Sequence, residues 1–217
     1  MTDFYQLYYK DEQKEKIYAF AQPYRTEGLT IFFENHWIAQ LVLSTKADKI
    51  GVTSWKLADK MRLRVGLRQP LTVEALNSDY QVMSFTRNSQ RHGMLAMANA
   101  WHPHFLTTIK LLWEKLGYKM PGEAKNPVYQ NAWVGKTDIY KRYVTEFLQP
   151  GMDLCLNDEQ LNQMMLQDSG YQKLARGADI KSVKEKLKLD FYPLCPFVFE
   201  RCPSLWMTLH NIPVTYL

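Results

Sequence analysis

The sequence is poor in the features that mark several common protein classes. Its three cysteines, Cys155, Cys195 and Cys202, are too few for a disulfide framework, and no pair has the spacing of zinc ligands. We therefore expect reduced thiols in a cytoplasmic protein. No stretch approaches the roughly 18 uninterrupted apolar residues of a membrane-spanning helix. The first residues lack a basic segment followed by an apolar run, so no signal peptide is expected.

Phosphate-binding and hydrolase motifs are also missing. The chain contains neither a Walker A pattern nor a G-x-G-x-x-G loop, and it has no G-x-S-x-G elbow. An Asp-x-Asp metal motif is absent as well. The sequence therefore assigns no metal ligands, and any phosphate must be held by means other than a glycine-rich loop.

Aromatic rings and positive charge are plentiful instead. The chain has 13 Tyr, 10 Phe and 6 Trp, and 27 Lys and Arg exceed 22 Asp and Glu to give a net charge of +5. This charge favours anionic partners such as nucleotide phosphates or nucleic acid. The 217 residues, 46% of them hydrophobic, suit one globular domain spanning 1–217, with 151–190 as a helical appendage.

Short β-prone segments alternate with helical ones. Strands are predicted over 4–9, 49–55 and 79–85, and helices over 29–43, 94–100, 107–116, 138–147, 158–167 and 180–189. Pro150 and Gly151 are expected to stop the helix that precedes them. This alternation predicts an α/β fold, a mixed sheet flanked by helices.

Polar and aromatic residues follow the predicted strands. In α/β sheets, ligands bind beyond the carboxyl ends of the strands. The residues at these ends are Tyr9 and Lys10, then Ser54, Trp55 and Lys56, then Thr86, Arg87 and Asn88. A ligand site is therefore expected where these three groups meet.

A basic stretch follows the second of these strands. From Lys56 to Arg68 the chain has one acid, Asp59, among five basic residues, Lys56, Lys60, Arg62, Arg64 and Arg68. Such a run creates a positive field for a diphosphate or a nucleic-acid backbone. A face that is merely solvated is the alternative interpretation.

A series of five motifs runs in order along nearly the whole chain. The motifs are Gly28–Thr30 with Phe33–Asn35, Lys49–Lys56, Asp79–Val82, Asn131–Tyr143 and Phe199–Arg201. Together they resemble motifs of small bacterial glycosyltransferase-like proteins from capsule and lipopolysaccharide loci, and of related phage proteins. The resemblance implies a single domain of the GT-A type, a fold of nucleotide-sugar-dependent glycosyltransferases.

The resemblance also implies roles for residues of this chain. The donor would contact Tyr9 and Lys10 with its base and ribose, Thr30 at the start of the adjacent helix with a phosphate, and Ser54, Trp55 and Lys56 with its diphosphate and sugar. Candidate bases for the acceptor hydroxyl are Asp79, His92 and Glu200. Candidate acceptor-binding residues are Arg87, Asn88 and Asn131.

The chain departs from the family pattern at one important place. It has Ser54, Trp55, Lys56 and Leu57 where the capsule-type proteins have His-Tyr-Arg-Arg. Lys56 is therefore expected to take over part of the task of a cation in stabilising the departing nucleoside diphosphate. Participation of Mn²⁺ or Mg²⁺ is left open.

Two acceptors fit this interpretation: a saccharide, or a hydroxymethylated base in phage DNA, with the duplex held by the stretch from Lys56 to Arg68. The alternative from another class is a degenerate transferase fold that acts as a nucleic-acid-binding or accessory protein. The oligomeric state is not predicted.

Overall fold

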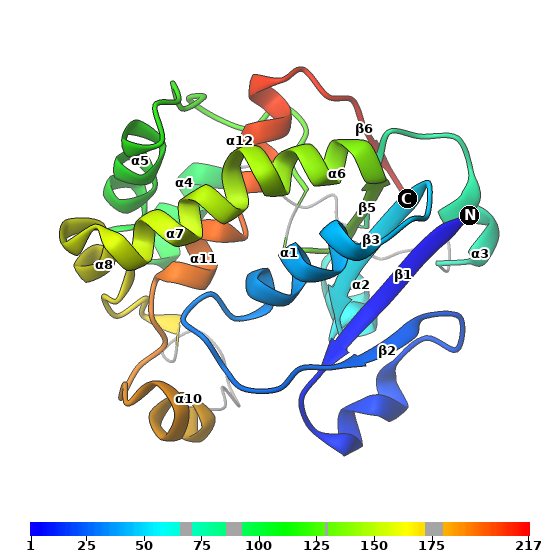
Figure 1. The fold of residues 1–217 in the computed structure, drawn as a ribbon, viewed down its shortest axis with the longest axis horizontal. Coiled ribbons are helices and arrows are strands. Elements are labelled where there is room, and N and C mark those ends of the chain that lie inside the picture. Colours follow the sequence, from blue (N-terminus) through cyan, green and yellow to red (C-terminus); the bar gives the residue numbers. More distant parts are fainter. Residues whose placement is uncertain (66–70, 86–92, 129, 172–179) are drawn as a thin grey trace.

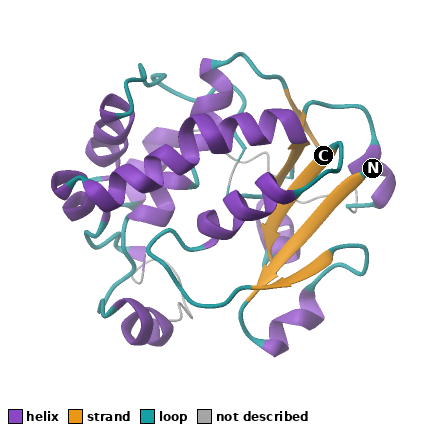
Figure 2. Cartoon of the chain, in the orientation of Figure 1, coloured by secondary structure: helices purple, strands orange, loops and turns teal. Residues whose placement is uncertain are grey.

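The computed structural model describes residues 1–65, 71–85, 93–128, 130–171 and 180–217, with the side chains of 62–65 left out. The chain forms a mixed six-stranded sheet flanked by helices, as the sequence predicts. Figure 2 shows the sheet on one side of the molecule and most helices on the other. None of the described helices is long and apolar enough to cross a bilayer.

The elements alternate along the chain. The strands are β1 (Thr2–Tyr8), β2 (Gln22–Arg25), β3 (Lys49–Ser54), β4 (Val82–Ser84), β5 (Trp133–Lys136) and β6 (Val214–Tyr216). The longer helices are α1 (Glu34–Ser44), α2 (Leu57–Val65), α4 (Met94–Trp101), α5 (Phe105–Lys115), α6 (Thr137–Tyr143), α7 (Gln149–Asn157), α8 (Glu159–Met165), α10 (Ile180–Leu187) and α12 (Cys202–Leu209). Shorter turns of helix are the 3₁₀ helix η1 (Asp11–Lys16), α3 (Val73–Asn77), the π-helix η3 (Val144–Leu148) and α11 (Cys195–Phe199).

The strand directions create one edge where most strands end together. The order in the sheet is β2-β1-β3-β5-β4-β6. β1 is parallel to β2 and β3, β4 is parallel to β6, and β5 runs antiparallel to both of its neighbours. The carboxyl ends of the other five described strands therefore meet at one edge, which we call the carboxyl edge (Figure 1).

Alternating side chains divide the core into two layers. Leu7, Ile50 and Val52 face a large cluster built with α1, α5 and the helices of the second half of the chain. Phe4 and Val134 face a smaller cluster with α2 and α3. Because successive residues of a strand point to opposite faces, both faces of the sheet are covered.

Helix α1 begins later than the predicted 29–43 segment. The Thr30 hydroxyl accepts the backbone N–H of Phe32 at 3.3 Å, and the Thr30 carbonyl accepts that of Phe33 at 3.1 Å. Phe33 has a φ of 52°, and the helix starts at Glu34. Local bonds from a threonine hydroxyl compete with helical ones, so Gly28–Phe33 form a turn instead of a first helical turn.

The prediction that Pro150 and Gly151 end a helix is wrong. α6, η3 and α7 follow one another without a break, and Figure 1 shows them as one long rod. Pro150 lies in the first turn of α7, directly after the π-helix, where the changed hydrogen-bond pattern tolerates a residue without an N–H.

The predicted appendage 151–190 is largely built into the domain. Met152, Cys155, Leu161 and Met165 are buried in the large core cluster. α10 differs, since among its residues Val183 alone is buried. All three thiols are free and buried, and burial raises the pKa of Cys155 to about 12.

The pairing of β1 with β3, in which Phe4 lies opposite Gly51, generates a test of the packing. A Cβ added at Gly51 would lie 2.7 Å from Phe4 Cδ2 and 3.2 Å from Val134 Cβ. Gly51→Ala should therefore lower the free energy of unfolding by about 1–3 kcal/mol, measured by urea denaturation.

Gly122→Ala is the matched control, because nothing lies within 4 Å of a Cβ at that position. It should change the free energy of unfolding by less than about 0.5 kcal/mol. Equal effects of the two substitutions would contradict the packing described at Gly51.

Candidate functional site

A pocket of about 450 Å³ lies at the carboxyl edge of β1 and β3. It is lined by Tyr9, Lys10, Glu12, Gln13, Lys16, Trp55, Lys56 and Tyr192. Four of the predicted donor-binding residues, Tyr9, Lys10, Trp55 and Lys56, are therefore brought together from two strand ends. The lining combines exposed or half-buried rings with three lysines, which suits a ligand that has both a flat face and negative charge.

Two of the lysines that line this pocket, Lys16 and Lys56, lie beside the ring of Trp55. The backbone N–H of Trp55 donates to the Leu7 carbonyl at 2.9 Å, which continues the pairing of β3 with β1. The ring centroid lies 5.0 Å from Lys16 Nζ and 5.2 Å from Lys56 Nζ. Cation–π attraction holds both ammonium groups beside the indole.

Lys56 carries its charge at a cost. Partial removal from water lowers its pKa below the ordinary value, and repulsion from Lys60 and Lys16 lowers it further. The carboxylates of Glu34 and Asp59 oppose this effect. Lys16 also forms an ion pair with Asp59, at 3.7 Å. Three lysines and one acid, Glu12, line the pocket, so its lining favours an anionic ligand.

Ser54 and Asn131 reach the same edge but lie deeper. The β3–β5 ladder runs to Gly51↔Val134, and Ser54 lies three residues beyond Gly51 as Asn131 lies three before Val134. Both residues are buried, and among the described residues neither Ser54 Oγ nor Asn131 Nδ2 has a hydrogen-bond partner. They do not line the pocket.

Two other predicted residues are elsewhere. Thr30 lies in the turn before α1, so the expected helix start at Thr30 is wrong. The true helix start carries the Glu34 carboxylate, which disfavours a phosphate there. Glu200 follows α11 and pairs with Arg201 at 3.1 Å. Neither Thr30 nor Glu200 is part of the pocket lining.

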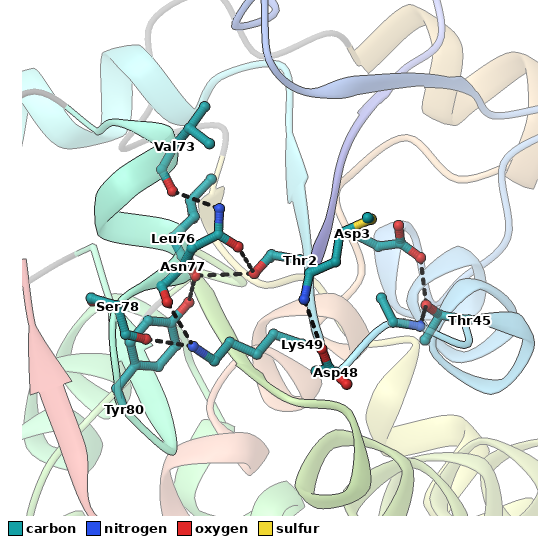
Figure 3. A network of polar contacts seen from close by, with 12 residues as sticks. Thr2, Asp3, Thr45, Asp48, Lys49, Val73, Leu76, Asn77, Ser78 and Tyr80 are labelled. Atoms are coloured by element: carbon teal, nitrogen blue, oxygen red, sulfur yellow. Dashed lines mark hydrogen bonds and ion pairs between the residues drawn. The ribbon is translucent and has the colours of Figure 1, made fainter.

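Asp79 lies at the opposite edge of the sheet. It precedes β4 and lies between Ser78 and Tyr80 in the sequence. Lys49, at the start of β3, donates a hydrogen bond to the Ser78 carbonyl (Figure 3), and its Nζ lies 4.2 Å from the centroid of the Tyr80 ring. In the same network Met1 pairs with Asp48 at 2.7 Å. The structure does not bring Asp79 to the pocket, because a residue before a parallel strand lies a full strand length from the carboxyl edge.

Three predicted residues, Arg87, Asn88 and His92, lie outside the described residues, as do the side chains of Arg62, Arg64 and Arg68. Within the described part of the chain, no group of three or more His, Cys, Asp or Glu is placed to hold a metal ion.

The sequence analysis missed Glu12, Gln13, Lys16 and Tyr192 in the lining. A signal for part of this set was present. Lys10, Gln13 and Lys16 recur every third residue, the period of a 3₁₀ helix. Tyr192 comes from a distant part of the chain, and no local pattern points to it.

Comparisons of the chain with protein-family models, with curated proteins and with solved structures found no significant match.

The lowered pKa of Lys56 generates a prediction on stability. The unfolded chain holds a proton on Lys56 more tightly than the folded chain does, so charged Lys56 destabilises the fold, and this effect disappears as the pH rises from the lowered pKa to the ordinary one. Lys56→Gln should therefore be at least as stable as the wild type at about pH 7, with a smaller difference at about pH 10, by urea denaturation.

Lys110→Gln, at an exposed position of α5, serves as the control for loss of one positive charge and should change stability little at either pH. A clear loss of stability in Lys56→Gln at neutral pH would contradict the electrostatic account of this pocket.

Proposed function

We propose that the protein is a nucleotide-sugar-dependent glycosyltransferase of the GT-A type, whose donor binds in the pocket at the carboxyl edge. The observation that carries the proposal is the Trp55–Lys56 pair, which lines a pocket with Lys10, Lys16 and the exposed ring of Tyr9. A nucleoside diphosphate sugar has the matching parts, a flat base and two adjacent phosphates. The order of the five sequence motifs supports the same assignment.

The lysines supply what the leaving group needs. When the bond between the anomeric carbon and the diphosphate oxygen breaks, negative charge grows on the diphosphate. Lys56 and Lys16, both beside Trp55, are positioned to stabilise that charge without rearrangement.

The acceptor hydroxyl must lose its proton as it attacks the anomeric carbon. With Asp79 at the opposite edge and Glu200 paired with Arg201, we propose Glu34 as the base for an inverting transfer. Its charge acts on Lys56, although Glu34 does not itself line the pocket. Glu34 lies in the first turn of α1 and supplies a carboxylate, one of the side-chain groups that act as general bases.

We further propose a saccharide as the acceptor. Within the described part of the basic stretch, Lys60 Nζ donates to the Gln130 carbonyl at 3.1 Å, so this lysine is engaged with the protein's own backbone. Lys56 faces the donor pocket. Neither is presented as a phosphate contact for duplex DNA, and DNA binding that falls steeply with salt would overturn this choice of acceptor.

The proposal predicts a donor-dependent gain in thermal stability. A nucleotide sugar at about a hundredfold excess over its Kd should raise the Tm by about 5–10 °C, because it binds only the folded chain. A panel of uridine, guanosine and cytidine nucleotide sugars, each with and without Mn²⁺, identifies the donor. Lys56→Ala and Trp55→Ala should lose most of the shift.

Lys110→Ala is the matched control and should keep the full shift, since it removes an exposed lysine outside the pocket. Absence of any shift with every donor would contradict the proposal and favour a non-catalytic accessory protein. A shift that persists in Lys56→Ala would locate the ligand elsewhere.

A further inference from the structure

The 3₁₀ helix η1 forms one wall of the pocket. In a 3₁₀ helix, side chains three residues apart lie one above the other. Gln13 and Lys16 within η1 have this spacing, Lys10 lies in extended backbone directly before η1, and all three line the pocket. The row thus presents an amide between two ammonium groups.

Gln13 is held in one orientation. Its side chain is 5% exposed, and Gln13 Oε1 accepts the backbone N–H groups of Tyr9 at 2.9 Å and Lys10 at 3.2 Å. An N–H group can only be accepted by the oxygen of a carboxamide, so the two N–H donors of Nε2 must be at the other side. Among the described residues, no group accepts from Gln13 Nε2.

The neighbouring Gln6 shows what a purely structural glutamine does in this part of the fold. Gln6 is fully buried, its Oε1 accepts the Tyr18 N–H at 2.7 Å, and its Nε2 donates to the Ser54 carbonyl at 3.2 Å. Both ends of Gln6 are satisfied by protein, as is usual for a buried carboxamide. In Gln13, which lines the pocket, the protein satisfies Oε1 and leaves Nε2 to donate to a ligand.

We propose that η1 recognises the diphosphate of the ligand and that Gln13 is the residue that selects it over a single phosphate; this inference rests on the proposed function. The row offers donors alone, which suits an anion with oxygens along its length. Lys16 and Lys56 flank Trp55, so the second phosphate lies between η1 and β3. Glu12, the acid in the lining, repels an anion bound away from the row formed by Lys10, Gln13 and Lys16.

Gln13→Glu separates recognition from folding. One carboxylate oxygen can still accept the N–H groups of Tyr9 and Lys10, while the other places negative charge where Nε2 donated. Binding of inorganic pyrophosphate, inorganic phosphate and the nucleoside diphosphates is measured by calorimetry, with urea denaturation to verify folding. We expect the affinity for pyrophosphate and for the nucleoside diphosphate to fall about tenfold or more, and that for phosphate to fall less.

Matched variants control for charge. Gln40→Glu adds the same charge on an exposed position of α1 and should bind as the wild type does. Lys16→Gln should weaken pyrophosphate binding, whereas Lys14→Gln, in η1 but outside the row and the lining, should not.

The outcomes distinguish this inference from the proposed function. If Gln13→Glu and Lys16→Gln bind pyrophosphate and nucleoside diphosphate within about twofold of the wild type, while Lys56→Ala loses nucleotide sugar, the inference falls and the function stands. If pyrophosphate binds with the expected pattern but no nucleotide sugar binds, the inference stands and the function falls. If the folded wild type binds neither, both fall.

Discussion

Positive charge that is partly removed from water around one indole is the constraint on which the site depends. Lys16 and Lys56 share the ring of Trp55, and Lys60 adds a third positive charge. Glu34 and Asp59 offset part of this charge. A fold that keeps such an arrangement loses some stability in the free protein and gains affinity for an anion that enters the pocket. The same electrostatic imbalance therefore links folding to binding.

The backbone brings these charges together through parallel strands. β1 and β3 are neighbours that end at the same edge, so the residues directly after them, Tyr9 and Trp55, must be close whatever their side chains are. Gln6 joins the end of β3 to the segment after η1, and Gln13 fastens η1 to the end of β1. These two glutamines hold the wall of the pocket without a glycine-rich loop.

Much of the architecture was predictable because it is encoded locally. A short β-branched run identified β3, and Gly117, with a φ of 78°, follows the end of α5 in the left-handed conformation that favours glycine. The start of α1 was mispredicted because the Thr30 hydroxyl stabilises a turn. The continuation through Pro150 was missed because the π-helix before it has no signature that can be read from a single sequence.

The residues of the site likewise divide into those that local sequence predicts and those that it does not. The strand-end rule located Tyr9, Lys10, Trp55 and Lys56, since it needs only the order of the strands. It could not find Tyr192, which reaches the pocket from a distant segment. Asp79 was proposed as a base from the family resemblance, and the structure places it before the amino end of β4.

A crystal structure of the protein with a nucleoside diphosphate tests the central claim most directly. The account predicts the diphosphate between η1 and Trp55, within hydrogen-bond distance of Gln13 Nε2 and the ammonium groups of Lys16 and Lys56, with the base against Tyr9. A ligand bound at another surface, or a pocket that stays empty at saturating ligand, would contradict it.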